Sequence, residues 1–276
     1  MKSVSKLQYL IIGSSVLLFV LLFIANKKPE KKAEEQMPGK RNAEALVDVK
    51  TFVDAQISVM PDSLKKTFGA LEKNAKDTAG LNTLANFFNK HAMPVPAAYY
   101  YEKKVELINT TKSWFEAGNR YFYSVRFVRD KNQAAALYQS AMRCYEKSLQ
   151  KNPDNTEAKI QLASCYVEGS QDPMKGITML KEVEKTDSSN IQVQMVLGGF
   201  AVKSGQLDKA EARYLKVLKL KPDYLEAYLF LADVYEKKGD KSKTIETLEK
   251  YLSLTSDKEI KEEIKKYIEQ LKKTNV

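Results

Sequence analysis

Side chains that commonly carry out chemistry are scarce in this chain of 276 residues. The single histidine, His91, follows Asn89 and Lys90 directly before a Met-Pro-Val-Pro turn, and we interpret it as a structural or neutral surface residue. The two cysteines, Cys144 and Cys165, have neither the CxxC spacing of a redox or metal motif nor a disulfide-dense setting. We expect two buried free thiols. A disulfide between them is the alternative if the domain faces an oxidising compartment.

The sequence contains none of the motifs by which common enzyme classes hold a phosphate, a zinc ion, a serine nucleophile or a dinucleotide. Carboxylates are abundant, but they fall beside lysines on the polar faces of predicted helices, where pairing of residues four apart explains them. We therefore expect no enzyme activity, no catalytic residue, no metal site and no cofactor.

Basic and aromatic side chains gather in one segment, residues 122–132. A predicted helical hairpin presents Tyr123, Arg126, Phe127, Arg129 and Lys131 there. Guanidinium and ammonium groups beside aromatic rings are typical of a surface that binds an acidic partner, a lipid surface or RNA. The alternative is a lengthened helix pair that packs its own aromatic side chains.

The distribution of charge argues against nucleic acid as the main partner. The formal net charge is +10, but residues 1–41 hold eight basic and three acidic side chains and thus supply +5. A nucleic-acid-binding domain concentrates basic charge on its folded surface. Because half of the charge lies outside the predicted repeats, we regard nucleic acid as an unlikely partner.

The N-terminal part of the chain predicts a membrane anchor. A short basic tail, 1–6, precedes an uncharged segment over 7–25, which is long enough to cross a hydrocarbon core of about 30 Å. The segment ends without the small-residue pattern of a cleavage site, so we expect an uncleaved single-pass helix in the lipid bilayer, in a bacterial inner membrane. A charged, flexible tether over 26–41 follows. The flanking lysines leave the side of the soluble domain open.

Beyond about residue 78 the chain repeats itself with a period near 34. Unit ends are marked by Pro153, Ser188, Pro222 and Ser256, at spacings of 35, 34 and 34 residues. Small residues recur where paired helices must approach closely, and large ones where successive pairs stack. The small set is Gly118, Ala141, Ala163, Gly198, Ala210 and Ala232, and the large set is Tyr145, Tyr166, Tyr214 and Tyr235.

The segment from Trp114 to Tyr121 resembles the W-x2-L-G-x2-Y pattern of the tetratricopeptide repeat, with Ala117 in place of leucine. The units at 191–224 and 225–258 repeat the pattern in register. The resemblance, closest to bacterial single-pass membrane-anchored members, implies an all-α fold. That fold is a solenoid of helical hairpins forming a right-handed superhelix, here preceded by one transmembrane helix.

This resemblance divides the chain into a series of units. Residues 42–77 form the N-terminal helices of the stack, and 259–276 an amphipathic capping helix. Between them, 78–258 hold five units: 78–110, 111–155, 156–190, 191–224 and 225–258. The second unit carries eleven residues more than the family pattern, between Tyr121 and Ala141, and we expect both of its helices to be lengthened by about a turn and a half.

Tetratricopeptide solenoids hold partners on the concave surface that the first helix of each pair lines. Carried over residue by residue, the groove would comprise Asn82, Asn86, Phe115, Asn119, Phe122, Ile160, Ser164, Val167, Met195, Gly199 and Val202. Such an apolar groove suits a peptide or an amphipathic helix of another protein. We therefore predict a membrane-tethered scaffold or adaptor for protein partners. The alternatives are a module that recruits nucleic acid or an acidic partner through 122–132, and an organelle import receptor.

Overall fold

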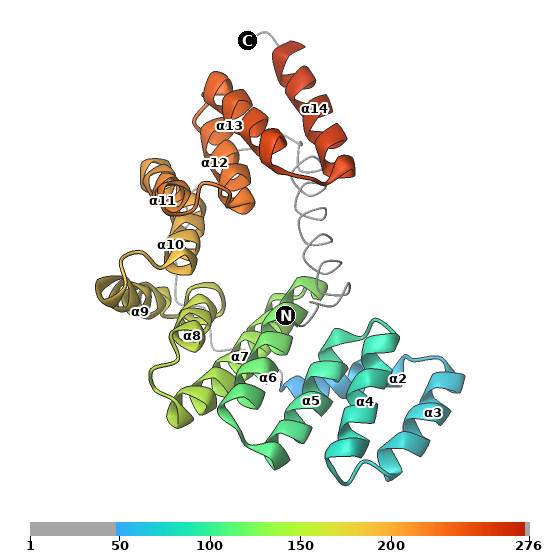
Figure 1. Cartoon of the computed structure of the whole chain (residues 1–276). Coiled ribbons are helices and arrows are strands. Elements are labelled where there is room, and N and C mark those ends of the chain that lie inside the picture. The colour runs from blue at the N-terminus through green and yellow to red at the C-terminus, as the bar shows by residue number, and fades with distance from the viewer. Residues whose placement is uncertain (1–47, 274–276) are drawn as a thin grey trace, which may run out of the picture.

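The computed structural model describes residues 48–273, and within that range the chain is entirely helical. Thirteen α-helices and one 3-10 helix, η1, follow one another in an open arc (Figure 1). Their bounds are α2 Val49–Ser58, α3 Asp62–Lys73, α4 Thr78–Lys90, α5 Pro94–Ile108, α6 Thr111–Ser124, η1 Val125–Phe127, α7 Lys131–Lys151, α8 Thr156–Gly169, α9 Pro173–Thr186, α10 Ile191–Lys203, α11 Leu207–Leu220, α12 Leu225–Lys237, α13 Lys241–Leu254 and α14 Lys258–Lys273. The predicted all-α solenoid is confirmed for this part of the chain.

Side chains of small polar residues begin most of these helices. An oxygen of the residue before the helix accepts a hydrogen bond from a backbone N–H of the first turn, which is otherwise without a partner. The residues that do so are Asp77, Thr110, Asp130, Asn155, Asp172, Asn190, Asp240 and Asp257. In the turns α10–α11 and α12–α13, Gly205 and Gly239 take φ values of +73° and +76°, which a side chain would strain.

Glycine and tyrosine meet inside two of the helix pairs, as the alternation of small and large residues predicts. A Cβ at Gly118 would lie 2.5 Å from the ring of Tyr145, and one at Gly198 would lie 2.5 Å from the ring of Tyr214. Both rings are buried. Because Gly118 and Gly198 have no side chain, α7 can pack closely against α6, and α11 against α10.

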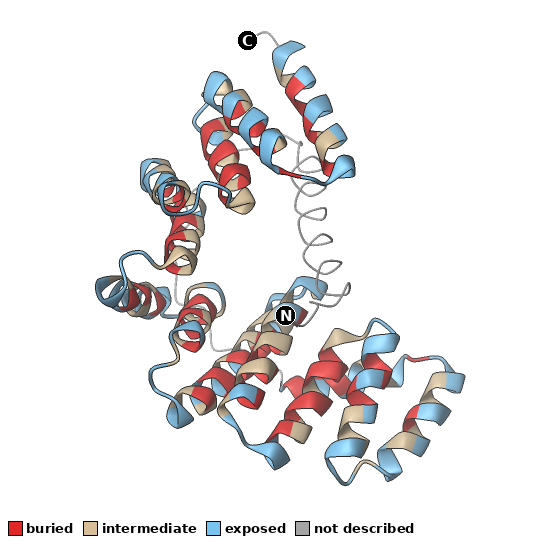
Figure 2. Cartoon of the chain, viewed as in Figure 1, coloured by how far each residue is buried: buried red, intermediate tan, exposed pale blue. Residues whose placement is uncertain are grey.

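The interior is a succession of apolar clusters, each shared by neighbouring helices. The first extends from α2 to α8, and three further clusters join α8 to α10, α10 to α12, and α12 to α14. Buried residues line the faces between helices, while exposed ones follow the outside of the arc (Figure 2). The predicted stripe of α14, which includes Ile260, Ile264, Tyr267 and Ile268, is buried against α12 and α13. Each pair is thus stabilised chiefly by the next.

The eleven extra residues of the second unit do not lengthen both helices, so that expectation is wrong. The helix α6 has 14 residues, like α8, whereas α7 has 21. Between them lie η1 and an extended segment from Val128, and Asp130 begins α7. The added length is therefore divided between this connection and the start of α7, which begins directly after Asp130 because that carboxylate accepts a hydrogen bond from the N–H of Gln133 at 2.8 Å.

The predicted membrane location is corrected. Among residues 48–273, no helix has the length and the apolar character needed to cross a bilayer. The predicted span at 7–25, the tail at 1–6 and the tether at 26–41 lie outside the described residues. We therefore withdraw the assignment to a membrane.

Candidate functional site: the concave wall and the edge beside it

The inner wall of the arc is lined by the first helix of each pair. The helix α10 contacts both α8 and α12, and α6 contacts α8, whereas α9 and α11 lie on the outer side (Figure 1). Because these inner helices run side by side, residues at equivalent positions of successive units form rows along the wall. A partner lying in the arc would meet these rows first.

Four of the predicted groove residues are largely occupied inside the protein. Ile160 and Ser164 are only 1% and 6% exposed, so they are corrected from groove to core. Ile160 packs in the cluster between α8 and α10, and the hydroxyl of Ser164 donates to the Ile160 carbonyl at 3.0 Å. The amide oxygens of Asn82 and Asn119 accept hydrogen bonds from Lys104 and from the hydroxyl of Tyr145.

The other predicted groove residues keep some exposed surface. Asn86 is exposed, whereas Phe115, Phe122 and Val167 are half-buried. The ring of Phe115 tilts against Tyr145, with centroids 5.7 Å apart. These side chains therefore pack within the solenoid and offer a partner only part of their surface.

An apolar strip lies where α10 meets α12. We define the inner strip as Met195, Gly199, Val202 and Phe230, all half-buried. Met195, Val202 and Phe230 pack against the buried cluster below, and the Phe230 ring stacks on Tyr214 at 5.7 Å. Gly199 leaves a shallow step between them, since a Cβ there would have only the Tyr214 hydroxyl, at 3.9 Å, as a neighbour. Phe230 was not among the residues predicted from sequence, although it lies 35 residues after Met195.

Three residues of the predicted hairpin patch come together at the end of α6. The rings of Tyr123 and Phe127 lie 5.2 Å apart, and the guanidinium of Arg126 lies 4.5 Å from the Tyr123 ring centroid. Tyr123 is 45% and Phe127 55% exposed. Arg129 and Lys131 follow on the exposed segment that leads into α7.

A cleft lies beside this patch, between α7, α8 and α10. It has a volume of about 400 Å³ and is lined by Tyr138, Val167, Glu168, Phe200, Lys203 and Ser204. The carboxylate of Glu168 accepts from the Tyr138 hydroxyl at 2.7 Å and from the Lys203 ammonium at 2.8 Å. Burial and the bond to Glu168 raise the pKa of Tyr138 well above its usual value, so this hydroxyl stays a donor.

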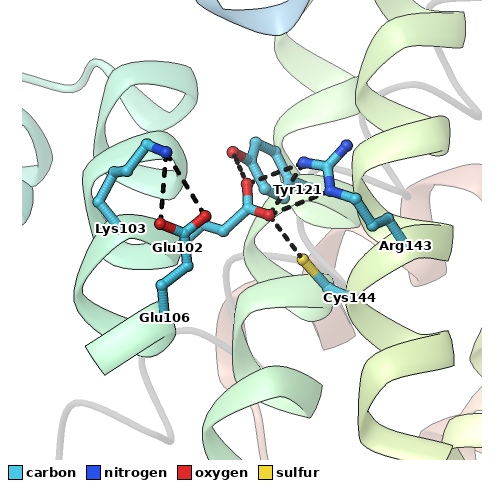
Figure 3. A network of polar contacts seen from close by, with 6 residues as sticks. All are labelled: Glu102, Lys103, Glu106, Tyr121, Arg143 and Cys144. Carbon is cyan, nitrogen blue, oxygen red and sulfur yellow. Dashed lines mark hydrogen bonds and ion pairs between the residues drawn. The ribbon is translucent and has the colours of Figure 1, made fainter. Parts of the chain in front are cut away.

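A buried carboxylate occupies the interface of α5, α6 and α7. Glu102 is 4% exposed and accepts from the hydroxyl of Tyr121 at 2.7 Å and from the guanidinium of Arg143 at 2.9 Å (Figure 3). The thiol of Cys144 lies 3.7 Å from the same carboxylate. Burial, followed by the charge of Glu102, raises the pKa of Cys144 well above its usual value. Both oxygens of the Glu102 carboxylate have partners within the protein, so this cluster is structural.

The remaining residues with possible chemistry are separate from one another. Cys144 and Cys165 are both buried and free, as the first interpretation predicted. His91 is exposed at the end of α4 and packs edge-on against Phe87 at 4.8 Å. No cluster of three histidine, cysteine or acidic side chains among residues 48–273 could hold a metal ion.

Comparisons with known proteins agree with the fold. One family model, described as TPR repeat, matches residues 202–239, and a second, Tetratricopeptide repeat, matches 225–258. A search of curated proteins finds no match.

Two solved structures share the architecture. One is a tetratricopeptide repeat protein from Parabacteroides merdae, with 16% identity, 81% of this chain and 86% of that chain covered, and a TM-score of 0.52. The other is a thermophilic tetratricopeptide protein of Thermus thermophilus, with 15% identity, coverage of 70% and 98%, and a TM-score of 0.50. Residues 202–258 thus match the tetratricopeptide repeat, and the described chain shares the helical-hairpin solenoid fold of these two structures.

Proposed function

We propose that the protein is a scaffold that holds a peptide or an amphipathic helix of another protein against the inner strip. The observation that carries this proposal is the strip itself: three half-buried apolar side chains and a glycine at the junction of α10 and α12. An apolar surface bounded by polar residues on a concave wall is typical of a site for a partner's apolar face. Tetratricopeptide repeats are generally interaction modules and not enzymes.

The polar surroundings of the strip favour a helix or peptide with charge on its flanks. Asp233, on the same helix as Phe230, forms an ion pair with Lys237. On α10, Lys203 is paired with Glu168. The lysines of these pairs are exposed and can exchange their partners for a ligand's carboxylates, because such surface pairs contribute only about 0–1 kcal/mol each. The apolar contacts would therefore supply most of the affinity, and the rim the specificity.

Photo-crosslinking in cells of the source organism tests the proposal. A photoreactive residue at Met195 should trap a defined protein, and Gly199→Glu in the same chain should abolish that band. The matched control is the same photoreactive residue at Leu215, an exposed apolar position on the outer helix α11. A band of equal intensity from both positions, or one that survives Gly199→Glu, would rule out the inner strip as the binding surface.

Recruitment of nucleic acid through 122–132 and organelle import gain no support from the described residues, and neither is proposed.

A further inference from the structure

One edge of the solenoid carries features that the concave-wall function does not use. The helices α6, α8 and α10 end at this edge, and the lengthened α7 begins there. Phe122, which directly precedes Tyr123 of the patch, packs its ring against Tyr138 of the cleft, with centroids 5.9 Å apart. The patch at the end of α6 and the cleft between α7, α8 and α10 are therefore neighbours, and we call the two together the α7 edge.

The cleft lies directly after the added part of α7. Tyr138 is the eighth residue of this 21-residue helix, at the position where the 14-residue helix α9 begins in its own unit. A Cβ at Gly169 would lie 2.2 Å from the Tyr138 ring, so the glycine is required for this ring to lie over the end of α8. Val167 and Phe200 complete the apolar lining. A space of about 400 Å³ falls within the range of ligand pockets and is ample for one large apolar side chain.

The basic side chains of the patch have no acidic partner within the described part of the protein. Arg126, Arg129 and Lys131 form no ion pair with any other residue in the described range 48–273. The nearest acid in sequence, Asp130, directs an oxygen at the backbone of Gln133 instead, where it begins α7. These three cations, beside the exposed rings of Tyr123 and Phe127, are suited to bind an anion that also has apolar groups.

The spacing between the two features is set by α7. From Lys131 to Tyr138 the helix rises about 10 Å, at roughly 1.5 Å per residue. An extended peptide covers that distance in about three residues, at roughly 3.3 Å each. A single short segment can therefore reach both the cleft and the cations.

We propose that the α7 edge binds a short acidic peptide segment of a partner protein. An apolar side chain of the segment fills the cleft against Val167 and Phe200, and carboxylates about three residues away face Arg126, Arg129 and Lys131. This site is distinct from the inner strip and does not depend on it.

The charge pattern favours an acidic peptide over RNA. A nucleic acid would need a basic track along several phosphates, but the next cation on the edge, Lys203, is already paired with Glu168. The cleft is lined by Tyr138, Val167 and Phe200 together with the polar residues Glu168, Lys203 and Ser204, and the Glu168 carboxylate would repel a phosphate backbone.

Fluorescence anisotropy with the full 276-residue chain tests the charge half of the proposal. The probe is a labelled synthetic peptide of twelve residues, with one phenylalanine followed three residues later by four glutamates. In low salt, the triple variant Arg126→Gln, Arg129→Gln and Lys131→Gln should weaken binding by about tenfold or more, at a few tenths to 1 kcal/mol per lost pair. The matched control replaces Lys181, Lys185 and Lys219, exposed on the outer helices α9 and α11, by glutamine and should leave affinity within about twofold.

A double-mutant cycle tests the cleft half. Ser204→Phe fills the cleft and should weaken binding of the probe, whereas a probe with serine for phenylalanine should bind wild type and Ser204→Phe equally. Circular dichroism checks that each variant is folded. If the triple variant does not fold, the single variant Arg126→Gln is used in its place for the charge test. The proposal is overturned if the probe does not bind, if a probe with lysines for glutamates binds as well, or if the control triple loses as much. Tighter binding of a twenty-nucleotide oligouridine that is lost in the same triple variant would identify the edge as a nucleic-acid site instead.

Discussion

At the scale of single residues, the costliest placement in the protein is that of a carboxylate in the interior. Glu102 has lost nearly all contact with water, and a buried charge is tolerated only when its partners satisfy it. Tyr121, Arg143 and Cys144 do so from two neighbouring helices. The arrangement joins α5, α6 and α7 in one register, because a shift of any of these helices would leave polar atoms without partners.

Replacing Glu102 by alanine is expected to lower the free energy of unfolding by about 3 kcal/mol, the lower end for a broken buried pair, since Arg143 can turn to solvent. The control is Glu106→Ala, one turn further along α5 in Figure 3, where an exposed pair with Lys103 contributes less than about 0.5 kcal/mol. Urea unfolding followed by circular dichroism measures both. Equal losses in the two variants would contradict the structural role of the buried carboxylate.

Two adjacent glycines on α10 should respond to alanine in opposite directions. In Gly198→Ala the new methyl group would meet the ring of Tyr214 at 2.5 Å, so we expect a loss of about 1–3 kcal/mol from overpacking. In Gly199→Ala it meets only a hydroxyl at 3.9 Å, and the gain in helix propensity should stabilise by up to about 1 kcal/mol. The two melting curves, recorded side by side, serve as controls for each other. A loss in both variants would show that α10 tolerates no side chain on either face.

At the scale of elements, the lengthened α7 distinguishes this solenoid. Its first two turns reach past the end of α6 and lie over the next unit, where Tyr138 bonds to Glu168. The start of the helix is fixed by one capping hydrogen bond, which the N–H of Gln133 donates to the carboxylate of Asp130.

Removing that bond in Asp130→Ala is expected to cost about 1 kcal/mol and to speed hydrogen exchange in the first turn of α7. Asparagine is an equally good capping residue, so Asp130→Asn should change the free energy by no more than a few tenths of a kcal/mol. Hydrogen exchange read by mass spectrometry resolves this turn from the rest of the helix. Unchanged protection in the alanine variant would mean that Tyr138 alone fixes the start of α7.

The sequence predicts the repeating elements well and the irregular one poorly. A period of 34 residues places Gly118 opposite Tyr145 and Gly198 opposite Tyr214, because each contact lies within one unit and small residues recur at equivalent positions of successive units. The segment 122–132 has helical character throughout, which hides the break at Val128. The Asp130-x-x-Gln133 pattern was the available signal for that break. Burial of Ile160 and Ser164 could not be predicted, since it depends on how closely α10 approaches α8.

At the scale of the whole molecule, tyrosine–glutamate hydrogen bonds join helices along nearly the whole arc. Within residues 48–273, seven tyrosine hydroxyls donate to a glutamate on another helix. They are Tyr100 to Glu72, Tyr101 to Glu116, Tyr121 to Glu102, Tyr138 to Glu168, Tyr166 to Glu146, Tyr235 to Glu211 and Tyr267 to Glu236. A phenol that donates to a carboxylate resists ionisation, and burial adds to that resistance.

This arrangement predicts a loss of stability in alkali. Burial and the glutamate partner raise the pKa of Tyr101 and of Tyr235 from 10.0 to about 12. Above pH 10 the unfolded chain releases these phenolic protons while the folded chain retains them. The contribution of the two tyrosines to the free energy of unfolding is therefore complete below pH 10 and is lost as the pH rises from 10 to about 12. Urea unfolding at pH 8, 10 and 11, with absorbance at 295 nm to report phenolate, measures both quantities. Stability that is constant to pH 11, with tyrosines titrating near 10, would contradict the prediction.

The succession of separate apolar clusters has a mechanical consequence. Since no cluster spans the arc from end to end, bending strain is shared among many small interfaces and no single one opens far. The arc is therefore elastic, and its curvature can increase or decrease by small rotations at each junction. The same wall can thus bind partners of different width. A force applied to one terminus would be transmitted from one helix pair to the next.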